Sequence, residues 1–274
     1  MTDHRRTDSD ATGQLEDLAL AAELVRAAGK LAARMLAEGL DTEHKSSVSD
    51  VVSAADHAAE ELVVSRLRAA RPADGVVGEE GTELPGGRTW FIDPVDGTYN
   101  FLSGLPYWCS AIALAEQSPD GNGWIPLLGA VYHPTADELW LGGLNHPTSC
   151  NGVAVPRLTE APLAELSLAS YLHPTSLSDD SVRQPVLSAF AGAATVRMLG
   201  SGSVELASVA GGRLGAWLQR NAPSWDWLPG AALVLAAGGR AESFDLRGQR
   251  WHIAGNARAV AEIRDRLIAY SAAG

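Results

Sequence analysis

Hydrophobic positions in the first quarter of the chain follow helical spacing. Between residues 14 and 39 the apolar side chains recur at steps of three and four, which is typical of an amphipathic helix. After a polar stretch, a second pattern of the same kind runs over residues 54–70, and Pro72 lies just beyond its end. The sequence therefore predicts two helices that each bury one face.

The spacing then changes to short apolar runs separated by Gly, Pro, Asn and Asp, which is typical of strands. These runs cover residues 76–77, 89–92, 110–115, 127–132 and 138–141. They predict a mostly antiparallel sheet behind the two helices, an α+β layer.

Beyond residue 155 the two patterns alternate. Strands are expected at residues 166–172, 194–199, 214–218, 241–244 and 252–254, and helices at 204–210, 227–237 and 257–270. This alternation favours a second, α/β layer. We therefore expect a disordered tail over residues 1–13, an N-terminal half over 14–154 and a C-terminal half over 155–274.

Composition narrows the class of protein. The 274 residues carry a formal net charge of -12, which argues against nucleic acid as the main partner, because phosphate backbones are bound by clustered Lys and Arg. The polar N-terminus lacks the apolar core of a secretory signal, and no apolar run reaches the ~20 residues of a membrane span. Cys109 and Cys150 suggest two reduced thiols. The expectation is a cytoplasmic protein without a membrane partner.

The most informative stretch is Asp93-Pro94-Val95-Asp96-Gly97, which follows an apolar run. A buried strand there would deliver two carboxylates three positions apart, Pro94 would fix the backbone, and Gly97 would allow a close approach to a ligand. Two such acids repel each other unless a cation lies between them or one takes a proton. Oxygen ligands of this kind suit Mg²⁺, which prefers sites shared with a substrate phosphate.

Other interpretations of this stretch are weaker. An EF-hand loop needs a Glu at its twelfth position, which counted from Asp93 is Gly104. A haloacid-dehalogenase phosphatase would have one residue between its acids near the start of the chain, whereas here two residues separate them. A solvated turn with incidental acids would not need the apolar run, the proline and the Gly-Thr pair. A phosphoesterase with two or three metal ions is favoured.

Two further acids have both a structural and a functional interpretation. Glu79 follows the short run at residues 76–77, so neighbouring strand ends would place it beside Asp93, although acids at strand ends are often merely solvated. Asp226 precedes an Ala-rich helix, where it could be a cap or first-turn acid. Together with Asp93 and Asp96, both become candidate metal ligands.

In this order, the three motifs resemble the inositol monophosphatase family, which belongs with fructose-1,6-bisphosphatase to a lithium-sensitive superfamily. The resemblance spans roughly residues 15–270. The matching residues are Gly78-Glu79-Glu80, Asp93 through Phe101, Trp225-Asp226, Lys45-Ser46-Ser47, Asp50, Val52, Ala55-Asp56, Cys150-Asn151-Gly152 and Ala237-Gly238-Gly239.

The resemblance implies an α-β-α-β-α sandwich, a homodimer, and a phosphoric monoester hydrolase that uses two or three Mg²⁺ ions and no covalent intermediate. The implied metal ligands are Glu79, Asp93, the carbonyl of Val95, Asp96 and Asp226. The implied catalytic residues are Glu79, Asp56 and Thr98, with Asp56 paired to the Thr98 hydroxyl and Glu80 behind the ligands. The implied substrate contacts are Asp96, Gly97, Thr98, Gly200, Ser201, Gln219, Arg220 and Asp226.

The sequence departs from the family pattern at Gln219, where a Glu usually contacts the substrate hydroxyls. Gln keeps the hydrogen-bonding capacity and loses the charge, and Arg220 adds a cation beside it. Gln219 could also be a surface residue without a ligand. A small phosphorylated metabolite is expected as substrate, inositol monophosphate or a related polyol phosphate first. Histidinol phosphate, a nucleotide 3′-phosphate and fructose 1,6-bisphosphate are the alternatives, and a catalytically silent binding protein is the alternative of another class.

Overall fold

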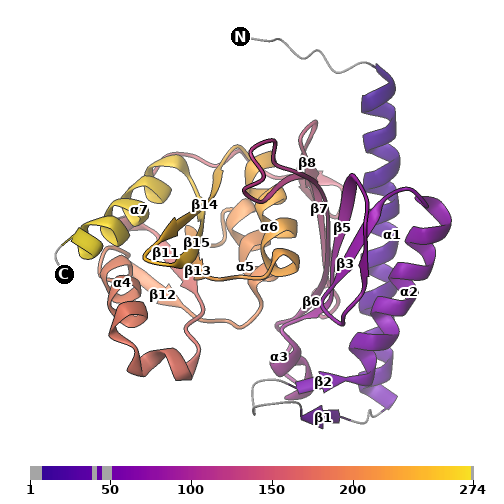
Figure 1. Cartoon of the computed structure of the whole chain (residues 1–274), viewed down its shortest axis with the longest axis horizontal. Coiled ribbons are helices and arrows are strands. Elements are labelled where there is room, and N and C mark those ends of the chain that lie inside the picture. Colours follow the sequence, from indigo (N-terminus) through magenta and orange to yellow (C-terminus); the bar gives the residue numbers. More distant parts are fainter. Residues whose placement is uncertain (1–7, 39–41, 45–50, 273–274) are drawn as a thin grey trace.

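The computed structural model describes residues 8–38, 42–44 and 51–272. It stacks five layers, helices, sheet, helices, sheet, helices, with the N-terminal helices at one end and the C-terminal helix at the other (Figure 1). The α-β-α-β-α sandwich predicted from the resemblance is confirmed. Lys45, Ser46, Ser47 and Asp50 of the family motif lie outside the described residues.

The outer helical layer consists of α1 (Asp8–Glu38) and α2 (Ala54–Ala70). Between them in the chain lie two short paired strands, β1 (Thr42–His44) and β2 (Val51–Ser53). The apolar face of the two helices packs on the first sheet through buried side chains such as Leu24, Val63 and Leu67. This burial gives the two helices the one-sided pattern that the sequence shows.

The first sheet has eight strands in the order β10-β9-β8-β7-β6-β5-β3-β4. Its strands are β3 (Gly75–Gly78), β4 (Glu83–Leu84), β5 (Arg88–Asp96), β6 (Cys109–Gln117), β7 (Trp124–His133), β8 (Glu138–Gly143), β9 (His146–Cys150) and β10 (Val153–Ala154). Every pair is antiparallel except β3 with β5, which run parallel.

The second sheet has five strands in the order β12-β11-β13-β15-β14. Its strands are β11 (Ser167–Ser170), β12 (Thr195–Arg197), β13 (Ala216–Arg220), β14 (Arg240–Leu246) and β15 (Gln249–Gly255). β11 is parallel to both of its neighbours, and the other pairs are antiparallel. On its outer face lie α4 (Asp180–Phe190) and α7 (Ala257–Ala272), and two 3₁₀ turns, Leu163–Glu165 and Pro174–Ser178, flank β11.

The middle layer consists of α5 (Gly202–Ala210) and α6 (Ser224–Ala236), which the chain contributes after its first sheet is complete. The largest buried cluster joins these helices to both sheets, with Phe91 and Val131 on one side and Trp217 and Ala254 on the other. The predicted division of the chain after residue 154 stays a prediction, since this core is shared by both halves. In the described part of the chain, no helix is both long and apolar enough to cross a membrane.

Several boundaries differ from the sequence expectation. α1 begins at Asp8, so residues 8–13 are helical and the tail expected over residues 1–13 is wrong there; a lone Gly13 costs about 1 kcal/mol in a helix and does not end one. α3 (Thr98–Leu102), α4, β4, β9 and β10 had not been expected. α3 and the three strands are too short to show a periodic pattern, and Pro185 interrupts the pattern of α4.

Candidate active site

The parallel pairing of β3 with β5 brings two predicted site residues together. Gly78 lies opposite Ile92, and the Glu79 amide donates to the Ile92 carbonyl at 3.1 Å. Glu79 therefore follows the end of β3 beside Asp93 on β5, and the two carboxyl groups share a hydrogen bond. The expectation that neighbouring strand ends place Glu79 beside Asp93 is confirmed.

At its end, β5 turns sharply around a glycine. The pairing of β5 with β6 shifts register between Asp93 and Asp96, and Gly97 follows with a φ of 95°. A Cβ added to Gly97 would lie 3.0 Å from the Gly200 carbonyl and 3.2 Å from the Ser201 Cβ. Position 97 therefore requires glycine for two reasons: its backbone is left-handed, and the segment before α5 leaves no room for a side chain.

Asp96 caps a helix that comes from the other half of the chain. Its carboxylate accepts the Ser203 amide at 2.5 Å and the Gly202 amide at 3.2 Å, both in the first turn of α5. A carboxylate at a helix N-terminus satisfies free amide groups and interacts favourably with the helix dipole. The Cys109 thiol lies 3.9 Å from the same carboxylate.

Asp226 lies in the first turn of α6, after a start at Pro223 that has no side-chain cap. It is close enough to Asp96 and Glu79 for their charges to raise its pKa, although withdrawal from water is the larger cause. The two middle-layer helices therefore serve the same cluster: α5 supplies amides to Asp96, and α6 supplies a fourth acid.

The four acids, which we call the acid cluster (Glu79, Asp93, Asp96 and Asp226), destabilise one another's ionised form. Burial, and then the charges of Glu79 and Asp96, raise the pKa of Asp93 well above its usual range. Glu79 is exposed as a residue, yet the protein around its carboxyl group raises its pKa from 4.5 to about 7. Burial also raises the pKa of Asp96, against the lowering effect of the Ser203 hydrogen bonds.

The acid cluster fits a divalent cation in its chemistry. Asp93 is 2% exposed, and its Oδ1 atom has no hydrogen-bond partner among the described residues. Oxygen donors that are buried, mutually repulsive and partly unsatisfied are those that a hard cation neutralises. Over residues 8–38, 42–44 and 51–272, however, no three acidic, His or Cys side chains converge closely enough to hold an ion, and Asp96 faces the α5 amides.

The other predicted catalytic residues lie around this cluster. Asp56 is 1% exposed on the first turn of α2, and its charge contributes to the raised pKa of Asp93. The Thr98 hydroxyl donates to the Val95 carbonyl at 3.0 Å, the oxygen implied as a backbone metal ligand. The pairing of Asp56 with Thr98 stays a prediction. The Glu80 carboxylate lies 3.2 Å from His57 Nδ1.

The predicted substrate contacts fall into two groups. Gly200 and Ser201 lie against Gly97, and Ser201 is 1% exposed. Gln219 and Arg220 end β13 and line a separate cavity of about 220 Å³. Arg220 donates to the Gln249 side chain and to Ser176 Oγ, and the buried Ser170 hydroxyl in the same cavity has no partner within the described residues.

One residue that supports the site had not been singled out in the sequence. Glu205 of α5 is 1% exposed and accepts hydrogen bonds from the Leu199 amide and from Trp217 Nε1, both at 2.9 Å. Asn100 donates to the Leu199 carbonyl from the other side. Glu205 and Asn100 thus fix the segment that meets Gly97. An acid within an otherwise apolar helix was the signal for Glu205.

Comparisons with known proteins show the family and the fold of the chain. The model of the inositol monophosphatase family matches residues 14–272. Inositol monophosphatase 3 of Solanum lycopersicum is 31% identical over 248 residues, which cover 85% of this chain and 90% of that protein. Histidinol-phosphatase of Streptomyces coelicolor is 33% identical over 273 residues, which cover 93% and 97%. The crystal structure of the extragenic suppressor protein suhB from Bartonella henselae superposes with a TM-score of 0.80 at 26% identity, covering 92% of this chain and 98% of that one.

The resemblance drawn from three short motifs therefore extends over nearly the whole length, in sequence and in fold. The relatives are named as phosphatases of two different small phosphate esters. The chain is a phosphoric monoester hydrolase and belongs to the inositol monophosphatase family.

Proposed function

We propose that this enzyme hydrolyses a small polyol phosphate, inositol monophosphate first, and that it depends on Mg²⁺. The observation that supports the metal is the acid cluster: several carboxyl groups with raised pKa values meet, and Asp93 Oδ1 has no partner among the residues described. Like charges so close together are stable at neutral pH only with a cation or with shared protons.

The donors that would hold Mg²⁺ are the carboxylates of the acid cluster and the Val95 carbonyl. When bound, Mg²⁺ lowers the pKa of a coordinated water and neutralises charge on the leaving oxygen. Asp96 Oδ2 accepts the Ser203 amide and Oδ1 accepts the Gly202 amide, so Asp96 would bind a metal through the remaining lone pairs of these oxygens or after releasing one amide.

The chain's own groups would position the phosphate and the water. The amides of Gly97 and Thr98 open α3 and are proposed phosphate donors. Asp56 and Thr98 would orient the attacking water next to Glu79, and Glu205 keeps the facing segment in place. Positioning and charge compensation are then sufficient for in-line displacement, so no enzyme nucleophile is needed.

The test is phosphate release from inositol 1-phosphate in EDTA and in graded Mg²⁺, for the native enzyme and for Asp93→Asn. Activity that requires Mg²⁺ and is lost in the variant supports the proposal. Glu116→Gln, at the far end of β6, is a matched control that removes one acid of the same sheet outside the acid cluster. Full activity of Asp93→Asn would refute the metal assignment.

Histidinol phosphate is the second candidate substrate. Gln219 takes the place of an acid that usually contacts polyol hydroxyls, and the Streptomyces relative named as a histidinol-phosphatase aligns over 273 residues. A panel of inositol 1-phosphate, histidinol phosphate, a nucleotide 3′-phosphate and fructose 1,6-bisphosphate, compared by kcat/KM, separates the candidates. If Gln219 contacts substrate, Gln219→Glu changes this ranking, whereas a residue without ligand contact leaves it unchanged.

The homodimer implied by the family resemblance is likewise a proposal. Several large apolar side chains are exposed in the C-terminal half, among them Tyr171, Leu177 and Met198, each more than two-fifths exposed. Such residues often mark an interface. Light scattering of the purified enzyme gives its mass in solution directly.

A further inference from the structure

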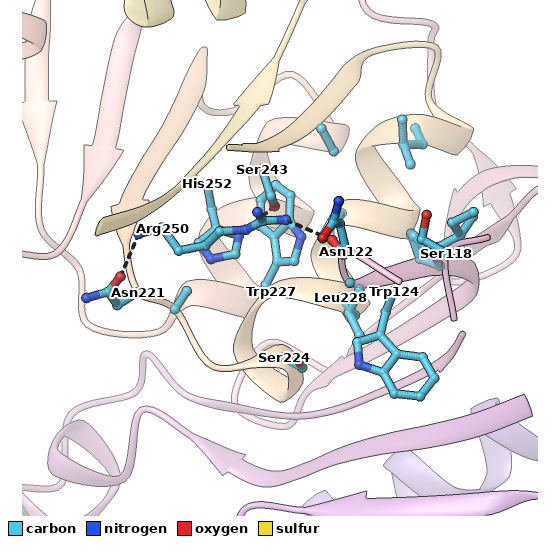
Figure 2. A pocket seen from close by; sticks show the side chains of 17 residues that line it. Ser118, Asn122, Trp124, Asn221, Ser224, Trp227, Leu228, Ser243, Arg250 and His252 are labelled. Atoms are coloured by element: carbon cyan, nitrogen blue, oxygen red, sulfur yellow. Dashed lines mark hydrogen bonds between the residues drawn. The ribbon is translucent and has the colours of Figure 1, made fainter. Parts of the chain in front are cut away.

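A cavity of about 450 Å³ lies along one side of α6, between this helix, the turn that joins β6 to β7, and the β14–β15 pair (Figure 2). None of the four residues of the acid cluster lines it. Its volume falls within the range of small-molecule sites. We call it the α6 cavity.

The wall of the α6 cavity that follows the helix is apolar. Trp227 and Leu228 contribute it from one turn of α6 and Ala231 from the next. Trp124 contributes an indole from the start of β7 (Figure 2). Flat aromatic and aliphatic walls of this kind favour a planar, apolar ligand body.

His252 gives the cavity a buried polar group. Its side chain is 7% exposed, and its ring lies 4.9 Å from the Trp227 ring, centroid to centroid. Nδ1 is paired with Ser243 Oγ at 2.8 Å, whereas Nε2 has no hydrogen bond within the described residues. Burial, and then the charge of Arg250, lower the pKa of His252 to about 4, so the ring is neutral at pH 7. Because His252 lines the cavity, its Nε2 is available to a hydrogen-bond partner bound there.

Arg250 gives the cavity its charge. Figure 2 shows its side chain reaching from β15 toward the backbone of Asn122, with the His252 and Trp227 rings beside it. Nη2 donates to the Asn122 carbonyl at 3.2 Å, and Nη1 donates to Asp245 at 2.9 Å. The Asp245 side chain is 71% exposed, so this ion pair is screened and easily exchanged.

The charge balance of the lining differs from that of the whole protein. The 17 lining residues, all within the described part of the chain, include Arg250 and no acidic residue, whereas the chain as a whole carries a net charge of -12. A cationic group in an acid-free lining favours an anion over a cation.

From these features we propose that the α6 cavity is a binding site for a small aromatic molecule with one anionic group. The ring packs on the apolar α6 wall of the cavity, the anionic group binds Arg250, and a polar ring atom bonds to His252 Nε2. The site is separate from the acid cluster, and the proposal does not depend on which phosphate ester is hydrolysed.

Three probes of the same shape test the charge preference: indole-3-acetate, its neutral amide indole-3-acetamide, and the cation tryptamine. Binding is measured by isothermal calorimetry on the full-length enzyme, with Mg²⁺ and inorganic phosphate present to occupy the acid cluster. We expect indole-3-acetate to bind about tenfold more tightly than the amide, a difference of about 1.4 kcal/mol, and tryptamine to bind weakest. Equal affinity of the three probes, or no binding at millimolar concentration, overturns the proposal.

Variants locate the site. Arg250→Gln should remove the preference for the acetate over the amide, and His252→Phe, which keeps a ring against Trp227, should weaken both probes severalfold. Arg258→Gln is the matched control, because Arg258 pairs with Glu262 on α7 outside the cavity. Unfolding temperatures verify that each variant is folded. A probe whose affinity is unchanged by both cavity variants, or which phosphate displaces, binds elsewhere, and that result also overturns the proposal.

Discussion

A group of acids lies at each end of strand β5, and the two groups differ in what compensates their charge. At its start, Asp17 accepts hydrogen bonds from Arg71 and Arg88, both at 2.7 Å, and Asp74 accepts from Arg88 and from Trp90 Nε1. At its end, none of the acid cluster forms an ion pair with a basic side chain among the described residues, and the acids raise one another's pKa.

Asp17 and Asp74 stabilise the fold through their ion pairs. The acids of the acid cluster repel one another, and the rest of the fold keeps them close together despite that repulsion. A buried carboxylate with guanidinium partners has its charge compensated, and removal of one partner leaves the other uncompensated. A buried carboxylate among carboxylates is compensated only by protons or by a cation. Burial of a single acid therefore does not mark a site in this protein, since buried Glu205 only holds a backbone segment and an indole. The convergence of several acids without a basic partner does.

The largest effect is expected for Asp93→Asn. We predict a loss of phosphate release of about a thousandfold, or roughly 4 kcal/mol in activation free energy, because the variant loses a central donor for the metal. The free energy of unfolding without metal should change by less than about 1 kcal/mol, because burial and the neighbouring acids raise the pKa of Asp93 and so disfavour the charge that Asn removes. Initial rates and urea unfolding of the same preparation measure both, and a large loss of stability would contradict the comparison.

Asp17→Asn should show the reverse behaviour. It leaves Arg71 and Arg88 without their shared carboxylate, and breaking a buried ion pair costs about 3–5 kcal/mol. The partial exposure of both arginines places the expected loss at the lower end of this range. The kcat per folded molecule should stay unchanged, which active-site titration corrected for the folded fraction can verify. A loss of kcat per folded molecule would contradict this and would mean that Asp17 or its arginine partners contribute to catalysis.

The pH dependence of stability should separate the two ends as well. The acid cluster has pKa values above those of the unfolded chain, so the folded state binds more protons, and its stability falls as pH rises from about 4.5 through 7. Mg²⁺ at a hundred times its dissociation constant should restore about 2.7 kcal/mol at pH 8. The test is to measure urea unfolding midpoints at pH 5 and pH 8, each with EDTA and with Mg²⁺. If Mg²⁺ raises the midpoint as much at pH 5 as at pH 8, the predicted repulsion within the acid cluster is wrong.

The smallest effect is expected for Glu205→Gln. Burial raises the pKa of Glu205 to about 8, so the acid is mostly neutral at pH 7, and Gln replaces it at a cost of about 1 kcal/mol for one poorly matched donor. Stability from the raised pKa is lost as pH rises from about 4.5 through 8, and the variant lacks this loss, so the stability gap between the two proteins should narrow up to about pH 8 and stay constant above it. Thermal unfolding of both proteins between pH 6 and pH 9 measures this difference in stability. A difference that does not change with pH would show that Glu205 is ionised throughout and would contradict the prediction.

The sequence predicted those parts of the fold in which local pattern and burial agree. α2 has the predicted bounds, and the five apolar runs predicted between residues 76 and 141 lie in β3, β5, β6, β7 and β8, because these runs face packed layers. α4 escaped because Pro185 interrupts its pattern, and β9 because its sequence, His146–Cys150, is mostly polar.

The site was predictable in a similar way. The spacing of Asp93, Asp96 and Gly97 carries its own physical argument, and the strand order then places Glu79 beside Asp93. The contact of Asp96 with the α5 amides depends on packing across more than a hundred residues of chain, which no local pattern reports. The α6 cavity was missed for the same reason, since β7, α6 and β15 form it jointly.

The bond from Asp96 to the first turn of α5 has a consequence for the order of events during synthesis. The ribosome releases the first sheet before α5 and α6 exist, so Asp93 and Asp96 emerge well ahead of the amide of Ser203 and of Asp226. Meanwhile the nascent sheet lacks the helices that cover its inner face, including Phe91 and Val131. Until residue 236 has emerged, the nascent chain therefore has an incomplete set of acids and an exposed apolar sheet face. We expect chaperone binding to be strongest during this interval.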